Sequence, residues 1–283
     1  MLAKTLNTKI SQSIDEDIKE TSLLTGGDIN KVYKIQTFGK KTYVLKLNDH
    51  SNSLKIFESE KEGLLTLGNT KTFKTPKIIS LGRDKETSFL LMEYIEEGTE
   101  YPSHDEEFGR NLATLHQVTQ NAFGFKQNNF IGNLPQYNEA RLTASSFYIE
   151  MRLEPQLRMA AEQGFKLKVE KPFSNISDII PKEPPALVHG DLWQGNTITA
   201  SNGFIYIIDP AVHYGHRETD IAMMLLFGGF SMQLFESYHE LYPLTHSWKD
   251  RLDIWQLYYL LVHLNLFGSS YYARVKQIID KYK

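Results

Sequence analysis

Two oxygen-bearing side chains stand five positions apart in one short loop of this 283-residue chain. The loop reads His189-Gly190-Asp191-Leu192-Trp193-Gln194-Gly195-Asn196. Its two glycines permit a tight turn, so the side chains of Asp191 and Asn196 can direct oxygens into one space. Carboxylate and amide oxygens that converge in this way suit a hard cation such as Mg²⁺. This loop is therefore the first place where the sequence indicates chemistry.

A third oxygen donor, Asp209, follows a predicted hairpin that begins where the loop ends. Two strand-like runs flank Ser201-Asn202-Gly203, and Asn-Gly is a strong hairpin signal. A hairpin centred between that Asn and that Gly would place Asn196 and Asp209 opposite each other, roughly 5 Å apart at Cα. Either residue alone could merely start or end a strand. Together with Asp191, they predict an Mg²⁺ site with Asn196 and Asp209 as ligands.

A site that transfers phosphate also needs backbone donors and a positive charge. Gly26 and Gly27 precede the first strand, where a glycine turn lets backbone N–H groups approach phosphate oxygens. Lys46 lies in the run Tyr43-Val44-Leu45-Lys46-Leu47. Taken singly these signals are weak, because adjacent glycines usually form an ordinary turn and a strand lysine is usually solvated.

Glu60 strengthens the case for Lys46. It shares one face of a predicted helix with Phe57 and Leu64, whereas Glu62 falls outside that face. An acid on an apolar helix face needs a partner, and Lys46 on the adjoining hairpin is the natural one. We therefore expect an ion pair between Lys46 and Glu60.

The elements that would position these residues divide the chain into two parts. Strand-like runs occupy residues 31–37, 42–47, 77–81 and 88–94, with one helix at 53–67 between them. Helical patterns begin at Ser103, where Glu106 completes a capping-box pattern, and continue at 143–163, 220–238 and 249–267. The sequence thus predicts an α+β fold with a small β-rich N-lobe at residues 1–95 and a larger, mainly helical C-lobe at 96–283.

An aromatic row lies in the last of these helical patterns. Its members are Trp255, Tyr258, Tyr259, His263 and Phe267. Such a row could bind a ligand, but helical spacing more often marks core packing, which is the interpretation we favour.

The composition excludes several classes of protein. The 31 Lys and Arg residues against 34 Asp and Glu give a net charge of −3, which provides no electrostatic footprint for nucleic acid. The absence of cysteine excludes a disulfide framework, a thiolate metal site and a catalytic thiol within this chain. Residues 1–15 lack the apolar centre of a signal peptide, and the most apolar run, 221–230, is too short to span a bilayer. We expect a cytoplasmic protein with no nucleic-acid or membrane partner.

In this chain order the candidate residues resemble those of the protein-kinase-like small-molecule kinases, and more narrowly the fructosamine (ketosamine) kinase family. The general pattern is His-x-Asp, an Asn five positions later, and then a metal-binding Asp, here 18 positions after Asp191. The narrower match rests on His189–Asn196, Asp209–Glu218 and Leu226-Phe227-Gly228-Gly229-Phe230. The resemblance runs from about Gly26 to Gly268 and implies a two-lobed protein-kinase-like fold.

The resemblance implies a role for each candidate residue, with ATP and Mg²⁺ as cofactors. Asp191 resembles the catalytic base that accepts the proton of a sugar hydroxyl, Asn196 and Asp209 resemble the Mg²⁺ ligands, and Asp220 resembles the Asp that braces the catalytic loop. The residues that would bind the nucleotide are Gly26 and Gly27, the pair Lys46 and Glu60, and the hinge residues Glu93, Tyr94 and Ile95. We expect Trp193 to border the acceptor pocket, with its apolar face towards sugar C–H groups. The alternative is a Trp193 that packs the loop onto the helical lobe.

The function that the resemblance implies is ATP-dependent phosphorylation of a sugar hydroxyl on a ketosamine, which leads to deglycation. Another small-molecule kinase, of the aminoglycoside or choline kinase class, is the alternative. A catalytically dead nucleotide-binding protein is disfavoured by the intact Asp191, Asn196, Asp209 and Lys46. Trp193 and the run 215–218 favour the ketosamine kinase. Which ketosamine is used, whether its amine is free or protein-bound, which hydroxyl reacts and which oligomer forms stay open.

Overall fold

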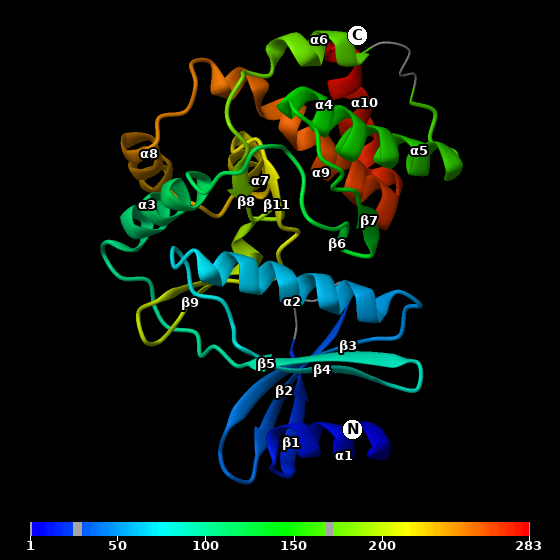
Figure 1. Cartoon of the computed structure of the whole chain (residues 1–283), viewed down its shortest axis with the longest axis vertical. Helices are drawn as coiled ribbons and strands as arrows, with labels where there is room; N and C mark the ends of the chain where they lie inside the picture. Colours follow the sequence, from blue (N-terminus) through cyan, green and yellow to red (C-terminus); the bar gives the residue numbers. More distant parts are fainter. Residues whose placement is uncertain (1, 25–29, 168–171, 283) are drawn as a thin grey trace. The chain divides into compact units, whose positions relative to one another are not determined.

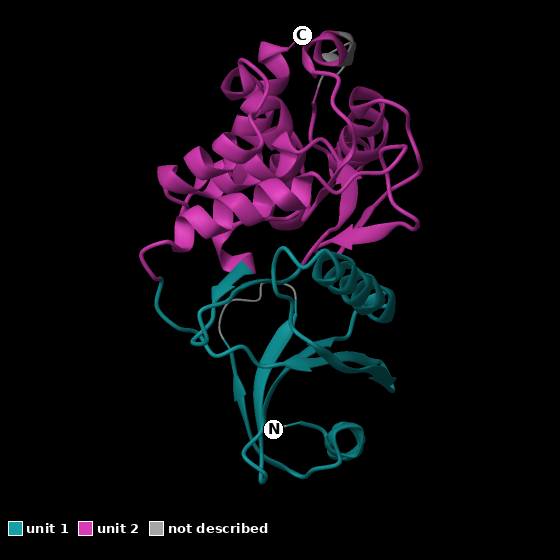
Figure 2. Cartoon of the chain, turned by 60° about the vertical axis from the view of Figure 1, so that its left-hand side comes forward, with its two compact units in different colours: residues 1–100, 197–209 teal, residues 101–196, 210–283 magenta. Residues whose placement is uncertain are grey.

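The structure is a computed structural model that describes residues 2–24, 30–167 and 172–282. Its contacts group the chain into two compact units, residues 1–100 with 197–209 and residues 101–196 with 210–283 (Figure 2). This grouping differs from the predicted division at residue 95, because residues 96–100 and 197–209 join the first unit. The described elements form an antiparallel β unit and a mainly helical unit, as expected for an α+β fold.

The first unit is built on a five-stranded antiparallel sheet with the strand order β1-β2-β3-β5-β4 (Figure 1). The strands are β1 Ile18–Leu23, β2 Lys31–Thr37, β3 Thr42–Asn48, β4 Ile78–Asp84 and β5 Thr87–Glu93. The last four match the predicted strands. β1 was not predicted, because Lys19 and Glu20 interrupt its apolar pattern.

Helices cover both faces of this sheet. Because successive strand residues point to opposite faces, Leu91 of β5 packs in one cluster with Ile10 of α1 (Lys4–Ile14). Its neighbour Leu90 packs in another cluster with Phe57 of α2 (Ser53–Asn69). The prediction of a single helix in the first hundred residues was therefore wrong, since α1 is a second one.

A hairpin distant in sequence completes the first unit. It consists of β9 Thr197–Thr199 and β10 Ile205–Ile207. The Gly98 N–H donates to the Thr199 carbonyl at 2.8 Å, and the Ser201 N–H donates to the Glu96 carbonyl at 2.8 Å. A Cβ on Gly98 would lie only 2.7 Å from the Cα of Ser201, so the two backbones meet at a distance that only glycine allows. These contacts explain why 197–209 belongs with the first unit.

The second unit is mainly helical. Its described helices are α3 His104–His116, α4 Ala144–Tyr148, α5 Glu154–Glu162, α6 Pro172–Ile179, α7 Glu218–Phe227, α8 Met232–Leu241, α9 Leu252–Phe267 and α10 Tyr272–Lys281. Two strand pairs accompany them, β6 Asn129–Ile131 with β7 Leu134–Gln136, and β8 Ala186–Val188 with β11 His213–Gly215.

Three features of these helices refine the predictions. The pattern at 220–238 is two helices, because Gly228 and Gly229 adopt φ of +72° and +91° and end α7. Ser103 stands at the start of α3 but makes no side-chain capping bond, so the capping box was wrong in that respect. In α9, Trp255, Tyr258 and Tyr259 are core residues exposed by 3% or less, which confirms the packing interpretation for them.

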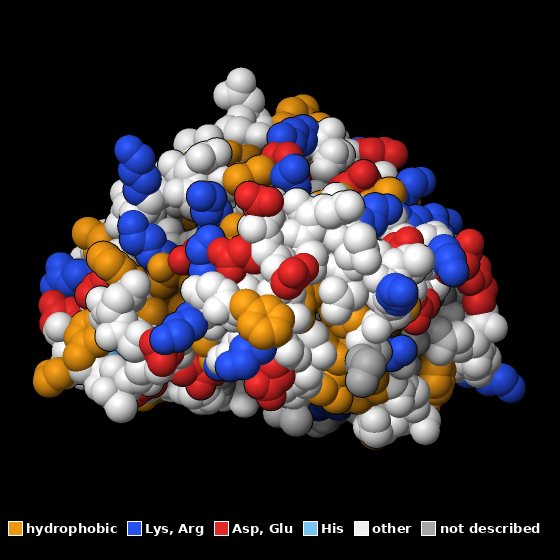
Figure 3. Space-filling model, turned by 90° about the horizontal axis from the view of Figure 1, so that it is seen from below, with side chains coloured by type: hydrophobic (Ala, Val, Ile, Leu, Met, Phe, Trp, Pro, Cys, Tyr) orange, Lys and Arg blue, Asp and Glu red, His pale blue; other side chains and the backbone are white. Residues whose placement is uncertain are grey.

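No helix among the described residues is long and apolar enough to cross a membrane. On the face of the molecule that Figure 3 shows, Lys and Arg side chains lie interspersed with Asp and Glu.

Candidate active site

The loop that carries Asp191 is held by hydrogen bonds to a buried aspartate. In the second unit, Asp220 of α7 accepts the His189 N–H at 2.8 Å and the Gly190 N–H at 2.9 Å. Gly190 has φ +83°, and a Cβ there would lie 2.2 Å from the carbonyl oxygen of Ala211. Burial alone would raise the pKa of Asp220, but hydrogen bonds from His116 and from the loop lower it. The loop is thus anchored by an ionised carboxylate.

Asp191 and Asn196 meet within this loop. The Asn196 side-chain amide Nδ2 donates to the Asp191 carbonyl oxygen at 2.8 Å and lies 3.3 Å from its carboxylate Oδ2. Asn196 is buried and Asp191 is half-buried. Because its nitrogen is engaged with Asp191, the amide oxygen Oδ1 of Asn196 is the atom that could bind a cation.

A buried triad occupies the first unit. Lys46 Nζ lies 2.7 Å from Glu60 Oε1, as expected from the helix pattern, and it also bonds Asp209 Oδ1, which the sequence did not predict. The side chains of Lys46 and Glu60 are 5% and 9% exposed, whereas that of Asp209 is 40% exposed. We call Lys46, Glu60 and Asp209 the lysine triad.

The charges in the lysine triad do not balance. Burial acts to lower the pKa of Lys46, but the carboxylates of Asp209 and Glu60 outweigh it, so the pKa is raised and Lys46 stays protonated. Burial raises the pKa of Glu60 to about 7, and the nearby negative charge of Asp209 adds to the effect. One lysine therefore faces two acids. When Glu60 is ionised, the two carboxylates outnumber the lysine and the excess negative charge favours binding of a cation.

The register of the β9–β10 hairpin corrects one prediction. Thr197 pairs with Ile207 and Thr199 with Ile205, so the hairpin is centred on Asn202 rather than between Asn202 and Gly203. In this register position 196 is opposite 208, and the predicted facing of Asn196 and Asp209 in the strand ladder was wrong. The physical reason is a three-residue loop in which Gly203 takes φ +81°, whereas a two-residue turn was assumed.

The donor atoms nevertheless suit Mg²⁺. Asn196 offers an amide oxygen, and Asp209 offers a half-exposed carboxylate with excess negative charge around it. Within the described ranges, no three His, Asp or Glu side chains gather as a metal-binding cluster. Each residue could supply one ligand to a cation whose other ligands are water or phosphate oxygens, which is usual for Mg²⁺. Their joint role stays a prediction.

The structure describes only some of the predicted nucleotide-binding residues. Glu93 ends β5, and its N–H donates to the Lys77 carbonyl at 2.9 Å, so this N–H is not a donor for adenine. In the segment that follows, the Tyr94 ring lies 4.2 Å from Lys34 Nζ and Ile95 is buried. The hinge role of Glu93, Tyr94 and Ile95 stays a prediction. Gly26 and Gly27 lie outside the described residues.

Trp193 lies in the 189–196 loop and is 38% exposed. Its ring lies against Gly195, where a Cβ would come within 2.2 Å of the indole Cη2 atom. The ring centroid of Phe227 is 6.4 Å away. Trp193 thus has a fixed position with one part packed and one part open, and its role towards substrate stays a prediction.

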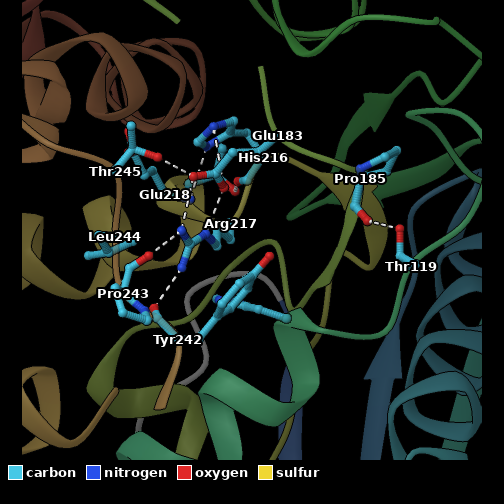
Figure 4. A network of polar contacts seen from close by, with 12 residues as sticks. Thr119, Glu183, Pro185, His216, Arg217, Glu218, Tyr242, Pro243, Leu244 and Thr245 are labelled. Carbon is cyan, nitrogen blue, oxygen red and sulfur yellow. Dashed lines mark hydrogen bonds and ion pairs between the residues drawn. The ribbon is translucent and has the colours of Figure 1, made fainter. Parts of the chain in front are cut away.

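Sequence reasoning missed a chain of polar side chains behind Asp220. His116 contacts Asp220 at 3.2 Å and the Tyr238 hydroxyl at 2.9 Å, and Arg217 donates to that hydroxyl at 3.4 Å. Glu183 accepts from Arg217 Nε at 2.6 Å and Nη2 at 2.9 Å (Figure 4). Single polar residues on four distant segments carry no spacing signal, so only the folded chain reveals them.

Glu183 ties together segments far apart in the sequence. Its carboxylate also accepts the Thr245 hydroxyl, while Arg217 donates to the carbonyls of Tyr242 and Pro243, each at 2.7 Å (Figure 4). Burial acts to raise the pKa of Glu183, but the Arg217 guanidinium and the Thr245 hydroxyl lower it to about 2. This ionised pair therefore fixes the start of α7 to the segment after α8.

Comparison with known proteins adds an independent result. The fructosamine kinase family model matches residues 2–283. A probable ketoamine kinase of Enterococcus faecium is 39% identical over 267 residues, which cover 92% of this chain and 94% of the relative. A crystal structure of a protein designated a fructosamine-3-kinase, from Haemophilus somnus, matches with a TM-score of 0.88 and 27% identity over 98% of this chain and 96% of that one.

More distant structures share the fold alone. An amicoumacin kinase in complex with AMP-PNP and Ca²⁺ matches with a TM-score of 0.56 and 14% identity over 99% of this chain and 93% of that one. The fold is thus that of the protein-kinase-like enzymes, and the family is decided by closer similarity. Since the family model spans nearly the whole chain and carries the Asp191 loop with it, this chain belongs to the fructosamine kinase family.

Proposed function

We propose that this kinase transfers the γ-phosphoryl group of ATP to a sugar hydroxyl of a ketosamine. Family membership supports the substrate class, and the lysine triad is the observation that carries the reaction type. A buried lysine held by an acid is the arrangement with which kinases orient ATP phosphates. The Asp191 loop, braced by Asp220, supplies the second half of the machinery.

Each residue has a defined task in this reaction. Asp191 accepts the proton of the acceptor hydroxyl, whose oxygen forms a bond to the γ-phosphorus as the bond to the ADP oxygen breaks. Lys46, kept protonated by Glu60 and Asp209, holds phosphate oxygens of ATP. Asn196 and Asp209 would hold Mg²⁺, which when bound neutralises charge on the phosphates. The backbone of the hinge residues Glu93, Tyr94 and Ile95 would bind adenine, without the Glu93 N–H, which donates to the Lys77 carbonyl.

Phosphorylation would make the ketosamine unstable and release the amine, so the biological result would be deglycation. ATP is supplied in the cytoplasm, which is the location that this proposal requires.

An ATP-consumption screen tests the proposal. Purified protein with Mg²⁺ is offered a panel of ketosamines, aminoglycosides and choline. We expect turnover with at least one ketosamine and with neither of the other classes. Turnover confined to an aminoglycoside or to choline would overturn the ketosamine assignment and leave a kinase of the alternative class.

Binding of Mg²⁺–ATP tests the metal ligands separately. Asp209→Ala should weaken this binding because it removes a charged ligand, and turnover should fall with it. Asp84→Ala, which changes a half-buried aspartate at the end of β4, is the matched control and should bind nucleotide as the wild type does. Equal affinity in wild type and Asp209→Ala would exclude Asp209 as a ligand.

A further inference from the structure

A row of aromatic rings continues from Trp193 along the second unit. The Trp193 ring centroid lies 6.4 Å from that of Phe227 at the end of α7, and Phe227 lies 4.9 Å from His263 of α9. His263 in turn lies 5.4 Å from Phe267 and 5.1 Å from Tyr271. We call these five residues the aromatic platform.

Core packing does not account for three of the five rings of the aromatic platform. Trp193, Phe227 and Phe267 are exposed by 38%, 42% and 47%, whereas Trp255 and Tyr259 of the same α9 helix are each exposed by 1%. Large apolar rings that share a surface and remain open to solvent are typical of a binding site. The aromatic row in α9 thus has a buried part that forms core and an exposed end that does not.

Glycines hold the aromatic platform against the catalytic loop. Gly228 and Gly229 end α7 directly after Phe227. A Cβ on Gly229 would lie 2.1 Å from Oε1 of Gln194, the residue after Trp193, so the turn and the loop are in direct contact. This contact gives the Leu226–Phe230 motif a role that the catalytic residues do not explain. It places Phe227 beside the tryptophan of the Asp191 loop.

We propose that the aromatic platform binds the amine half of the ketosamine while its sugar hydroxyl is presented to Asp191. This inference rests on the proposed function. A ketosamine differs from a simple sugar by a secondary amine, which is cationic when protonated, and by the alkyl chain that the amine carries. Aromatic faces attract an ammonium group, and they remove an adjoining alkyl chain from water. Trp193 would contact the sugar, and Phe227 and Phe267 would contact the amine and its chain.

Two ketosamines with the same sugar and different amines test this inference, the sugar being that of a ketosamine turned over in the ATP-consumption screen. One carries methylamine and the other butylamine, so only the second can extend along the aromatic platform. We expect wild type to show the higher kcat/KM with the butylamine adduct. Phe227→Ala should lower the ratio of kcat/KM for the butylamine adduct to kcat/KM for the methylamine adduct about fivefold, through a higher KM for the butylamine adduct. Phe227→Tyr should restore it.

A second test variant and a control variant complete the experiment. Phe267→Ala, at the exposed end of α9, should lower the same ratio even if Phe227→Ala folds poorly. Leu241→Ala truncates a side chain of α8 that is 43% exposed, and as the matched control it should leave the ratio and the melting temperature unchanged. A ratio that stays at the wild-type value in folded Phe227→Ala and Phe267→Ala would overturn the aromatic platform while the proposed function stands. If wild type phosphorylates no ketosamine of the ATP-consumption screen, the proposed function fails and this inference fails with it.

Discussion

At the scale of single residues, the lysine triad is the most constrained part of the molecule. Lys46 is almost completely shielded from water and contacts two carboxylates instead. Glu60 is buried, whereas Asp209 is partly exposed to solvent. Glu60 therefore fixes the lysine, whereas Asp209 is the acid that another cation can approach. The two acids have different tasks because their exposure differs.

Glu60→Gln should reduce turnover roughly tenfold or more, because the amide no longer supplies the charge that orients Lys46. Glu58→Gln is the matched control on the same helix, since Glu58 is exposed and should contribute little. Steady-state kinetics of the two variants make the comparison. Equal losses in both would contradict the assigned facing of α2.

Asp191→Asn should lower turnover by about 10²–10⁴, the range for a general base, and leave ATP affinity nearly intact. The reason is that, in the proposed reaction, Asp191 serves the acceptor hydroxyl while Lys46 holds the phosphates. Isothermal titration with nucleotide and a coupled ATPase assay separate the two effects. Turnover near the wild-type value would show that another group is the base.

Sequence alone predicted some of these residues and missed others for physical reasons. The Lys46–Glu60 pair followed from an acid on an apolar helix face, which is a local pattern. The bond from Lys46 to Asp209 joins residues 163 positions apart and has no local pattern. The same holds for His116 and Glu183, whose partners are brought to them by the fold.

At the scale of elements, the short turns between strands and helices position the candidate site residues. Gly190 in the loop after β8 has φ +83° and contacts the backbone of Ala211, so both its conformation and its lack of a side chain are required. Periodicity predicts the helices and strands well because burial repeats along them. It does not fix a register, since hairpin loops of two and three residues share the Asn-Gly signal and differ by one position.

Gly190→Ala should cost about 2 kcal/mol or more in the free energy of unfolding, because a positive φ and a steric clash add together. Gly164→Ala is the matched control in the same unit. It has φ +89° with no atom within 4 Å of the added Cβ, so only the conformational cost of about 1 kcal/mol should appear. Urea denaturation measures the free energy of unfolding of both variants. An equal loss of stability in the two would contradict the close contact at Gly190.

Glu183→Gln should lower stability at pH 7 by about 2 kcal/mol, as expected for a charged hydrogen bond. The pKa of Glu183 is lowered from its ordinary 4.5 to about 2, so its contribution is complete above 4.5 and is lost as the pH falls towards 2. The stability difference between wild type and variant should therefore shrink over that range. Denaturation at pH 7, 4 and 2.5 measures it, and a constant difference would contradict the ionised pair.

At the scale of the whole molecule, the chain passes between its two units three times, at residues 100–101, 196–197 and 209–210. The first unit is consequently discontinuous in sequence. Its hairpin supplies Ala200 and Tyr206, which pack with Ile95. The sequence reading placed one boundary near residue 95 because the change from strands to helices is local, whereas the return of 197–209 depends on long-range hydrogen bonds.

A fragment of residues 1–100 should therefore be less stable than the same fragment joined by a flexible linker to residues 197–209. The hairpin covers Ile95 and accepts the Gly98 N–H, and without it these groups are exposed. Thermal unfolding followed by circular dichroism compares the two fragments. Equal melting temperatures would show that the hairpin adds nothing to the first unit.

The contrasting surroundings of two tryptophans have a practical consequence. Trp255 is 1% exposed and should emit at short wavelength whatever binds, while Trp193 is 38% exposed beside the catalytic loop. A molecule that covers the Trp193 indole would shield it from a soluble quencher such as iodide. If Trp193 borders the acceptor pocket, as predicted, acceptor binding can be followed through this loss of quenching, without a label and without turnover. A Trp248→Phe variant removes the third tryptophan, which is half-buried and open to the same quencher.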